Sequence, residues 1–184
     1  MDPKTFQMDV YVDADFMGKY GTDKPTDPDN VKSRAGYVIS LNGCPLAWQS
    51  KLMDPICLST MMAEYYALSM AMREVLPLRD LVRTVGKGLK IDDKVMSTFK
   101  VKVWEDNMGA LTLANLDPGQ QTPRSKFYWS KAHFFRSFLN RESDGTGNQM
   151  TVEKIGTLDQ QGDLLTKWLP REPFQRLRKL IMGW

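Results

Sequence analysis

The sequence has few of the residues that several common kinds of protein chemistry require. It contains one histidine and two cysteines, Cys44 and Cys57, with no CxxC spacing and no histidine cluster around them. We therefore expect reduced thiols without metal ligation, and we expect no disulfide scaffold. Free thiols of this kind are typical of the cytosol or the nucleus.

Long apolar runs are also missing. No stretch of about 18 apolar residues is present that would span a bilayer. The first residues lack the charged-then-apolar pattern of a signal peptide, so we expect a soluble chain without membrane contact. The sequence shows no internal repeat and no low-complexity segment, and its 184 residues are predicted to form a single domain over residues 1–184.

The formal net charge is only +3, but the basic residues concentrate in the C-terminal third. A basic stripe favours binding to a polyanion, whereas solvated helix faces give similar counts, and the charge pattern leaves both interpretations open.

The apolar pattern of the first half predicts a three-stranded antiparallel meander. In the stretch FQMDVYVDADF (6–16), Met8, Val10 and Val12 alternate with acidic and aromatic residues, which is typical of a strand with one buried face. Asp9 is expected to face solvent. The next two strands, 36–41 and 44–49, flank Asn42-Gly43, a strong hairpin signal because both residues tolerate positive φ.

The second half alternates helices with single strands and completes an α/β domain with a mixed sheet. A helix capped at Ser59-Thr60 is predicted to end at Gly86, with Pro77 inside it. The remaining predicted elements are a strand over 99–107, a helix over 108–116, a helix over 125–140, a strand over 150–155, a helix opening at 159–169 and a helix over 171–182.

Four carboxylates stand beside apolar residues at the edges of separate elements. They are Asp13 (or Asp15 on the same strand face), Glu64, Asp106 and Asp163. If they converge, their repulsion raises their pKa values unless cations neutralise them, and Mg²⁺ or Mn²⁺ prefers such oxygen ligands. Taken singly, each acid also has an ordinary interpretation: Asp163 as an acid at a helix N-terminus, Asp106 as a turn former, with Asp159 as the N-cap of the helix that carries Asp163.

Six motifs carry a resemblance to a known family. They are YVDADFMG (11–18), SRAGYV (33–38), WQSK (48–51), LSTMMAEYYAL (58–68), EDNMGAL (105–111) and DQQGDLLTK (159–167). In order and spacing, over nearly the whole chain, they resemble the ribonuclease H domain of copia-type LTR-retrotransposon polyproteins. The resemblance implies a ribonuclease H-like fold, with a five-stranded mixed sheet made of an antiparallel three-stranded meander and two parallel strands, flanked by helices.

The resemblance also implies an activity. The family cuts the RNA strand of RNA/DNA hybrids during reverse transcription, using two divalent ions, Mg²⁺ or Mn²⁺, held by an Asp-Glu-Asp-Asp set. The residues of this chain that match the set are Asp13, Glu64, Asp106 and Asp163, with Asp15 as the reserve candidate. The implied partners are an RNA/DNA hybrid and the reverse transcriptase domain of the same polyprotein. The implied location is cytoplasmic, in a virus-like particle if the element is active, with the nucleus as the alternative.

The sequence departs from the family at one motif, because it reads Lys126-Phe127-Tyr128-Trp129 where the family has Lys-His-Ile-Asp or a close variant. Cellular ribonucleases H also use a histidine between the last strand and the last acid-bearing helix, and residues 155–162 of this chain contain none. An alternative is therefore a catalytically inactive module that binds nucleic acid or supports a neighbouring polymerase. A related DNA-strand transferase is a third possibility, which the motifs match less well. The sole histidine, His133, is expected to be a packed or capping helix residue.

The helix predicted over 125–140 supplies candidates for nucleic-acid contact. Arg124, Lys126 and Lys131 would track a phosphate backbone, with Tyr128 and Trp129 beside them. In the alternative interpretation the phenylalanines of this helix form a core stripe and the basic groups are solvated.

Overall fold

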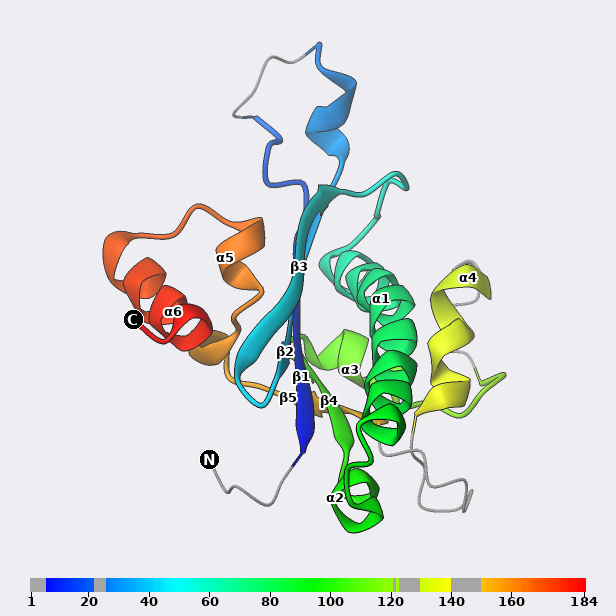
Figure 1. The fold of residues 1–184 in the computed structure, drawn as a ribbon. Coiled ribbons are helices and arrows are strands. Elements are labelled where there is room, and N and C mark those ends of the chain that lie inside the picture. The colour runs from blue at the N-terminus through cyan, green and yellow to red at the C-terminus, as the bar shows by residue number, and fades with distance from the viewer. Residues whose placement is uncertain (1–5, 22–25, 121, 123–129, 140–149) are drawn as a thin grey trace.

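The computed structural model describes residues 6–21, 26–120, 122, 130–139 and 150–184, with Ser130 and Lys131 described by their backbone alone. Figure 1 shows a central sheet with helices on both faces. Helices α1 and α4 lie on one side of the sheet, and α5 and α6 lie on the other.

The sheet has five strands in the order β3-β2-β1-β4-β5. Strands β1 and β2, and strands β2 and β3, pair antiparallel, whereas β1 with β4, and β4 with β5, pair parallel. The predicted five-stranded mixed sheet, a meander with two added parallel strands, is therefore confirmed. The strands are β1 (Gln7–Asp15), β2 (Arg34–Leu41), β3 (Cys44–Leu52), β4 (Lys100–Glu105) and β5 (Met150–Lys154).

The predicted hairpin between β2 and β3 is also confirmed. Asn42 and Gly43 have φ values of 49° and 81°. Two consecutive positive φ values match the twist of a two-residue hairpin, and this is the conformation for which Asn-Gly is favoured.

Helices and short 3₁₀ turns make up the layers on either side of the sheet. The α-helices are α1 (Thr60–Gly88), α2 (Asp93–Ser97), α3 (Met108–Ala114), α4 (Ser130–His133), α5 (Asp163–Thr166) and α6 (Arg171–Met182), and the 3₁₀ helices are η1 (Pro28–Val31), η2 (Phe134–Phe138) and η3 (Thr157–Asp159). None of these described helices combines the length and apolar character needed to cross a membrane.

The core lies between the sheet and α1. Met8, Val10 and Val12 of β1 belong to one buried cluster with Leu68 and Met72 of α1. Helix α1 begins as predicted, because the Ser59 hydroxyl accepts a hydrogen bond from the Met62 N–H at 3.1 Å.

Several predicted helix boundaries are wrong. Helix α1 continues past Gly86 to Gly88, and a β-carbon at Gly86 would lie 2.6 Å from the sulfur of Met96 in α2, a helix that the sequence pattern did not predict. Gly86 therefore allows helix packing and does not stop the helix. Helix α5 spans only 163–166 and its N-cap is Gly162, so Asp159 lies too far ahead of the helix to cap it. Asp159 instead accepts a hydrogen bond from Arg176 of α6.

The helix predicted over 125–140 is described only in part. Its described residues form α4 followed by the 3₁₀ helix η2, so the α-helical geometry ends at His133 and not at 140. The first residues of this predicted helix, 125–129, lie outside the described part of the chain.

Helix α5 packs unusually close to the sheet, and two glycines permit this. A β-carbon at Gly162 would lie 2.9 Å from the backbone nitrogen of Asp13, and one at Gly36 would lie 2.8 Å from the β-carbon of Leu165. Gly36 pairs with Asp13 in the β1–β2 ladder. The backbone of the α5 region thus rests directly on the strand that carries Asp13.

This close approach generates a stability prediction. Gly162→Ala should lower the free energy of unfolding by about 1–3 kcal/mol, because the added methyl group overlaps backbone atoms of β1 that have little room to move. Gly156→Ala is the matched control: no atom lies within 4 Å of the added carbon, and the φ of −74° suits alanine. Urea denaturation of both variants measures the difference, and equal stabilities would contradict the packing argument.

Candidate active site

Three of the four predicted acids meet at the carboxyl ends of β1 and β4. These strands are parallel neighbours whose ladder ends at the Tyr11–Trp104 pair, so Asp13 and Asp106 lie just beyond it. Glu64 reaches the same place from the first turns of α1. Carboxylate oxygens of Asp13, Glu64 and Asp106 lie within 4.8 Å of one another.

The fourth acid, Asp163, joins this group through a lysine. The Lys167 Nζ donates to Oδ1 of Asp13 at 3.0 Å and to Oδ1 of Asp163 at 2.8 Å. Lys167 was not among the site residues predicted from the sequence. A signal for it was present, because it follows Asp163 by four residues, which is the spacing of an ion pair on a helix. One ammonium group therefore supplies a positive charge between two of the acids.

Both oxygens of Asp13 accept hydrogen bonds from the C-terminal end of α5. The Thr166 hydroxyl, in the last residue of α5, donates to Oδ2, and Lys167, which directly follows the helix, donates to Oδ1. Asp13 is fully buried. These contacts hold its carboxylate in one orientation, because each oxygen has its own donor.

Glu64 is the acid most perturbed by its surroundings. It is 4% exposed, and its Oε2 is buried with no hydrogen-bond partner among the described residues. Burial raises the pKa of Glu64 to about 10, and the neighbouring charges of Asp13, Glu105 and Asp106 add to the shift. In the absence of a bound cation, Glu64 therefore holds a proton at neutral pH.

A further buried carboxylate, Glu105, belongs to the same pocket. Its Oε1 accepts from the Asn107 N–H at 2.9 Å, and burial raises its pKa to about 8. The sequence contained a signal for this residue, because Val101, Val103 and Glu105 alternate on the buried face of β4. The pKa of Asp163 is raised to about 6, first by burial and then by Asp13.

This donor set fits a divalent cation with oxygen ligands. Among the described residues the cluster offers only carboxylates, and one buried oxygen there, Oε2 of Glu64, has no hydrogen-bond partner. A bound cation would satisfy that oxygen and reverse the repulsion that raises the pKa of Glu64.

Comparisons with known proteins agree with this geometry. No family model matches the chain. It is 30% identical over 93% of its length to the retrovirus-related Pol polyprotein from transposon TNT 1-94 of Nicotiana tabacum. It is 29% identical over 96% of its length to that from transposon RE1 of Arabidopsis thaliana. The chain spans about a tenth of the length of these curated relatives.

Among solved structures, the fold resembles the N-terminal ribonuclease H domain of rv2228c from Mycobacterium tuberculosis. The TM-score is 0.52 at 11% sequence identity, over 95% of this chain and 98% of that one. The chain has the ribonuclease H fold and is homologous to a segment of retrotransposon Pol polyproteins. The resemblance inferred from the sequence motifs is thereby confirmed.

Within the ribonuclease H fold, a buried glutamine holds the two central strands at the site. Gln160 Nε2 donates to the carbonyl oxygens of Val12 at 2.8 Å and Trp104 at 3.3 Å, and its Oε1 accepts from the Gly162 N–H. It thus bridges β1 and β4 where their ladder ends and ties α5 to both. The sequence pattern did not single out this residue.

The predicted nucleic-acid contacts fall outside what the structure describes. Arg124 and Lys126 lie among the undescribed residues, as does the Phe127–Trp129 departure, and only the backbone of Lys131 is described. His133 is a packed helix residue as expected, since its Nδ1 lies 2.8 Å from the Tyr65 hydroxyl.

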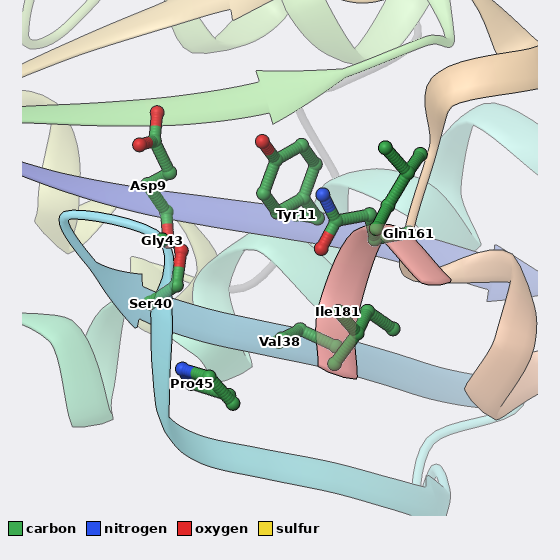
Figure 2. A pocket seen from close by; sticks show the side chains of 9 residues that line it. Asp9, Tyr11, Val38, Ser40, Gly43, Pro45, Gln161 and Ile181 are labelled. Carbon is green, nitrogen blue, oxygen red and sulfur yellow. Dashed lines mark hydrogen bonds between the residues drawn. The ribbon is translucent and has the colours of Figure 1, made fainter. Parts of the chain in front are cut away.

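The expectation that Asp9 faces solvent is wrong. It is half-buried, and its Oδ1 accepts from Gln7 Nε2 and from Trp104 Nε1. Figure 2 shows Asp9 beside a separate hollow of about 220 Å³ that β1, the β2–β3 hairpin and α6 enclose. Of the described residues that line this hollow, Asp9 alone carries a carboxylate, so they form no second group like Asp13, Glu64 and Asp106.

The raised pKa values generate a pH prediction for the metal-free protein. Glu64 changes its pKa from 4.5 when exposed to about 10 when folded, so its folded form binds the proton more tightly. The resulting stabilisation is fully present below pH 4.5 and is lost as the pH rises towards 10, with a slope of up to about 1.4 kcal/mol per pH unit.

We expect the free energy of unfolding in EDTA to fall between about pH 6 and pH 9, and Glu64→Gln to make the decline shallower. The raised pKa values of Glu105 and Asp163 should account for the pH-dependent decline that remains in Glu64→Gln. The exposed Glu74 on the same helix provides the control, Glu74→Gln, which should keep the wild-type slope. Denaturation at each pH tests this, and identical slopes for Glu64→Gln and the wild type would contradict it.

Proposed function

We propose that the chain is a divalent-metal-dependent endonuclease that hydrolyses the RNA strand of RNA/DNA hybrids. The observation that carries the proposal is the convergence of Asp13, Glu64 and Asp106 within 4.8 Å of one another, with Oε2 of Glu64 buried and lacking a hydrogen-bond partner among the residues that the structure describes. The ribonuclease H fold and the Pol polyprotein relatives support the choice of substrate.

The metal ligands in this proposal are Asp13, Glu64 and Asp106, with Asp163 as a ligand for a second ion. Mg²⁺ or Mn²⁺ bound to such a set polarises a phosphodiester, lowers the pKa of a water molecule and stabilises the leaving oxygen. The protein residues supply orientation. Lys167 and Thr166 hold Asp13, and Gln160 keeps the ends of β1 and β4 in place beneath it.

Lys167 has a second role in this proposal. Its ammonium group neutralises part of the charge of Asp13 and Asp163 before any metal ion binds. The metal-free pocket is therefore tolerated in the folded state, while Glu64 remains protonated and must release its proton to become a ligand.

The relatives also support a place in reverse transcription. Because they are Pol polyproteins about ten times the length of this chain, we infer that the reverse transcriptase region of the same polyprotein is its partner. In that setting an RNA/DNA hybrid is the product of one activity and the substrate of the other.

Cleavage of a labelled RNA/DNA hybrid tests the proposal directly. The chain should cut the RNA strand with Mg²⁺ or Mn²⁺ present and leave it intact in EDTA. Asp106→Asn should lower the rate at least about 100-fold, because it removes a negative oxygen ligand while preserving the shape of the side chain. Gel analysis with either strand labelled measures both effects.

The exposed Asp80→Asn variant of α1 is the matched control and should cut at the wild-type rate. Binding of the hybrid without cleavage under either metal would contradict the proposed activity and identify the chain as an inactive nucleic-acid-binding module.

Metal binding can be tested without any substrate. Mg²⁺ or Mn²⁺ should raise the melting temperature, since an ion that binds the folded state at about 100 times its Kd adds about 2.7 kcal/mol of stability. Glu64→Gln should abolish most of this shift, whereas Glu74→Gln should retain it. An equal shift in all three proteins would place the ion elsewhere and overturn the ligand assignment.

A further inference from the structure

A second and larger hollow, of about 880 Å³, lies next to the acidic cluster on the α5 side of the sheet. Thr166 and Lys167 line this hollow and also donate hydrogen bonds to Asp13, so they connect it to the acidic cluster. Its far wall includes Trp168, in the connection between α5 and α6, and Phe174 in the first turns of α6. We call this space the α5 groove.

The charged lining of the α5 groove is mainly positive. Among the described lining residues, Lys19, Arg34 and Lys167 are positively charged and Asp15 alone is negatively charged. A guanidinium nitrogen of Arg34 donates to the Ser50 hydroxyl at 3.1 Å, which holds the guanidinium across the strand ends. An excess of positively charged side chains in a hollow beside the acidic cluster suits the binding of a phosphate backbone.

The aromatic lining of the groove is turned to solvent. The Trp168 side chain is fully exposed, and Phe174 is 44% exposed. An exposed indole next to cations matches the way proteins hold unpaired bases, which stack on an aromatic face while their phosphates meet Lys and Arg. Bases inside a duplex already stack on their neighbours, so this arrangement favours an unpaired strand.

We propose that the α5 groove binds single-stranded nucleic acid that extends from the hybrid, with its phosphates against Lys19 and Arg34 and a base stacked on Trp168. The proposal deepens the proposed function and rests on it for the nature of the neighbouring substrate. The binding that it describes requires no metal ion and no cleavage.

The experiment compares blunt hybrids with hybrids that carry an unpaired extension. Fluorescence anisotropy in EDTA measures the affinity of the full chain for a blunt hybrid and for hybrids of the same paired length with a 5′ or 3′ extension, in RNA or DNA. An extension of about ten nucleotides falls within the site size of single-strand-binding folds.

The wild type should bind at least one extended hybrid more tightly than the blunt one. Trp168→Ala should reduce that preference about 5- to 100-fold, since stacking on an aromatic side chain typically contributes about 1–3 kcal/mol per base. Arg34→Gln should lower the dependence of log affinity on log salt concentration by about 0.7 for the extended hybrid. Neither substitution removes a core side chain, because Trp168 is exposed and Arg34 is half-buried at the end of a strand.

The matched control is Trp48→Ala. The Trp48 indole is 66% exposed on β3 and does not line the α5 groove, so this variant should keep the wild-type preference. Equal affinity of the wild type for blunt and extended hybrids would overturn the proposal, as would an unchanged preference in Trp168→Ala. Cleavage of the blunt hybrid by the wild type is scored separately. A wild type that cuts but shows no preference for extended hybrids rejects only the groove, and a wild type that shows the preference but does not cut rejects only the nuclease.

Discussion

Electrostatic repulsion among buried carboxylates constrains this molecule more than any other interaction. Asp13, Glu64, Glu105 and Asp106 gather where β1 and β4 end, and burial there raises the pKa of Glu64 to about 10 and that of Glu105 to about 8. A pocket of this kind folds only if protons or cations reduce its charge. Lys167 supplies one such cation, and the proposed metal ions supply the others.

The close packing of the backbone around α5 places Lys167 beside Asp13. Gly162 and Gly36 remove the β-carbons that would separate α5 from β1 and β2, and Gln160 replaces ladder hydrogen bonds where β1 and β4 diverge. With α5 this close, Thr166 and Lys167 reach both oxygens of Asp13. The close packing of α5 on β1 and the stabilisation of the Asp13 charge therefore depend on each other. A larger distance between α5 and β1 would leave the Asp13 carboxylate without these donors.

The position of the acidic cluster beside the α5 groove would let the proposed nuclease site and the proposed strand-binding groove cooperate. Without cations the acidic cluster would repel phosphates, while Lys19 and Arg34 of the adjoining α5 groove would attract them. Lys167 lies at the border between these two regions of opposite charge. Substrate would thus be held by the groove and drawn to the acids only when cations have neutralised them.

Local features of the chain could be predicted because each depends on a few consecutive residues. The Asn42-Gly43 turn, the Ser59 cap and the alternation of β1 follow from backbone preference and burial over short windows. The acids Asp13, Glu64 and Asp106 were found because motif order and spacing resemble a known family. The start of α5, the role of Gly86 and the partners of Asp9 were misjudged, since each depends on a neighbour distant in sequence.

Tertiary structure alone decided how the site is supported. The Lys167 ammonium meets Asp13 across 154 positions of the chain, and Gln160 meets Val12 across 148. Local sequence preferences cannot predict such contacts. They form only when β1 and β4 pair in parallel, so that their ends align, and when Gly36 and Gly162 allow α5 to pack directly on the sheet. The chain's residue types specified a cluster of carboxylate oxygens, and long-range packing specified which side chains hold that cluster together.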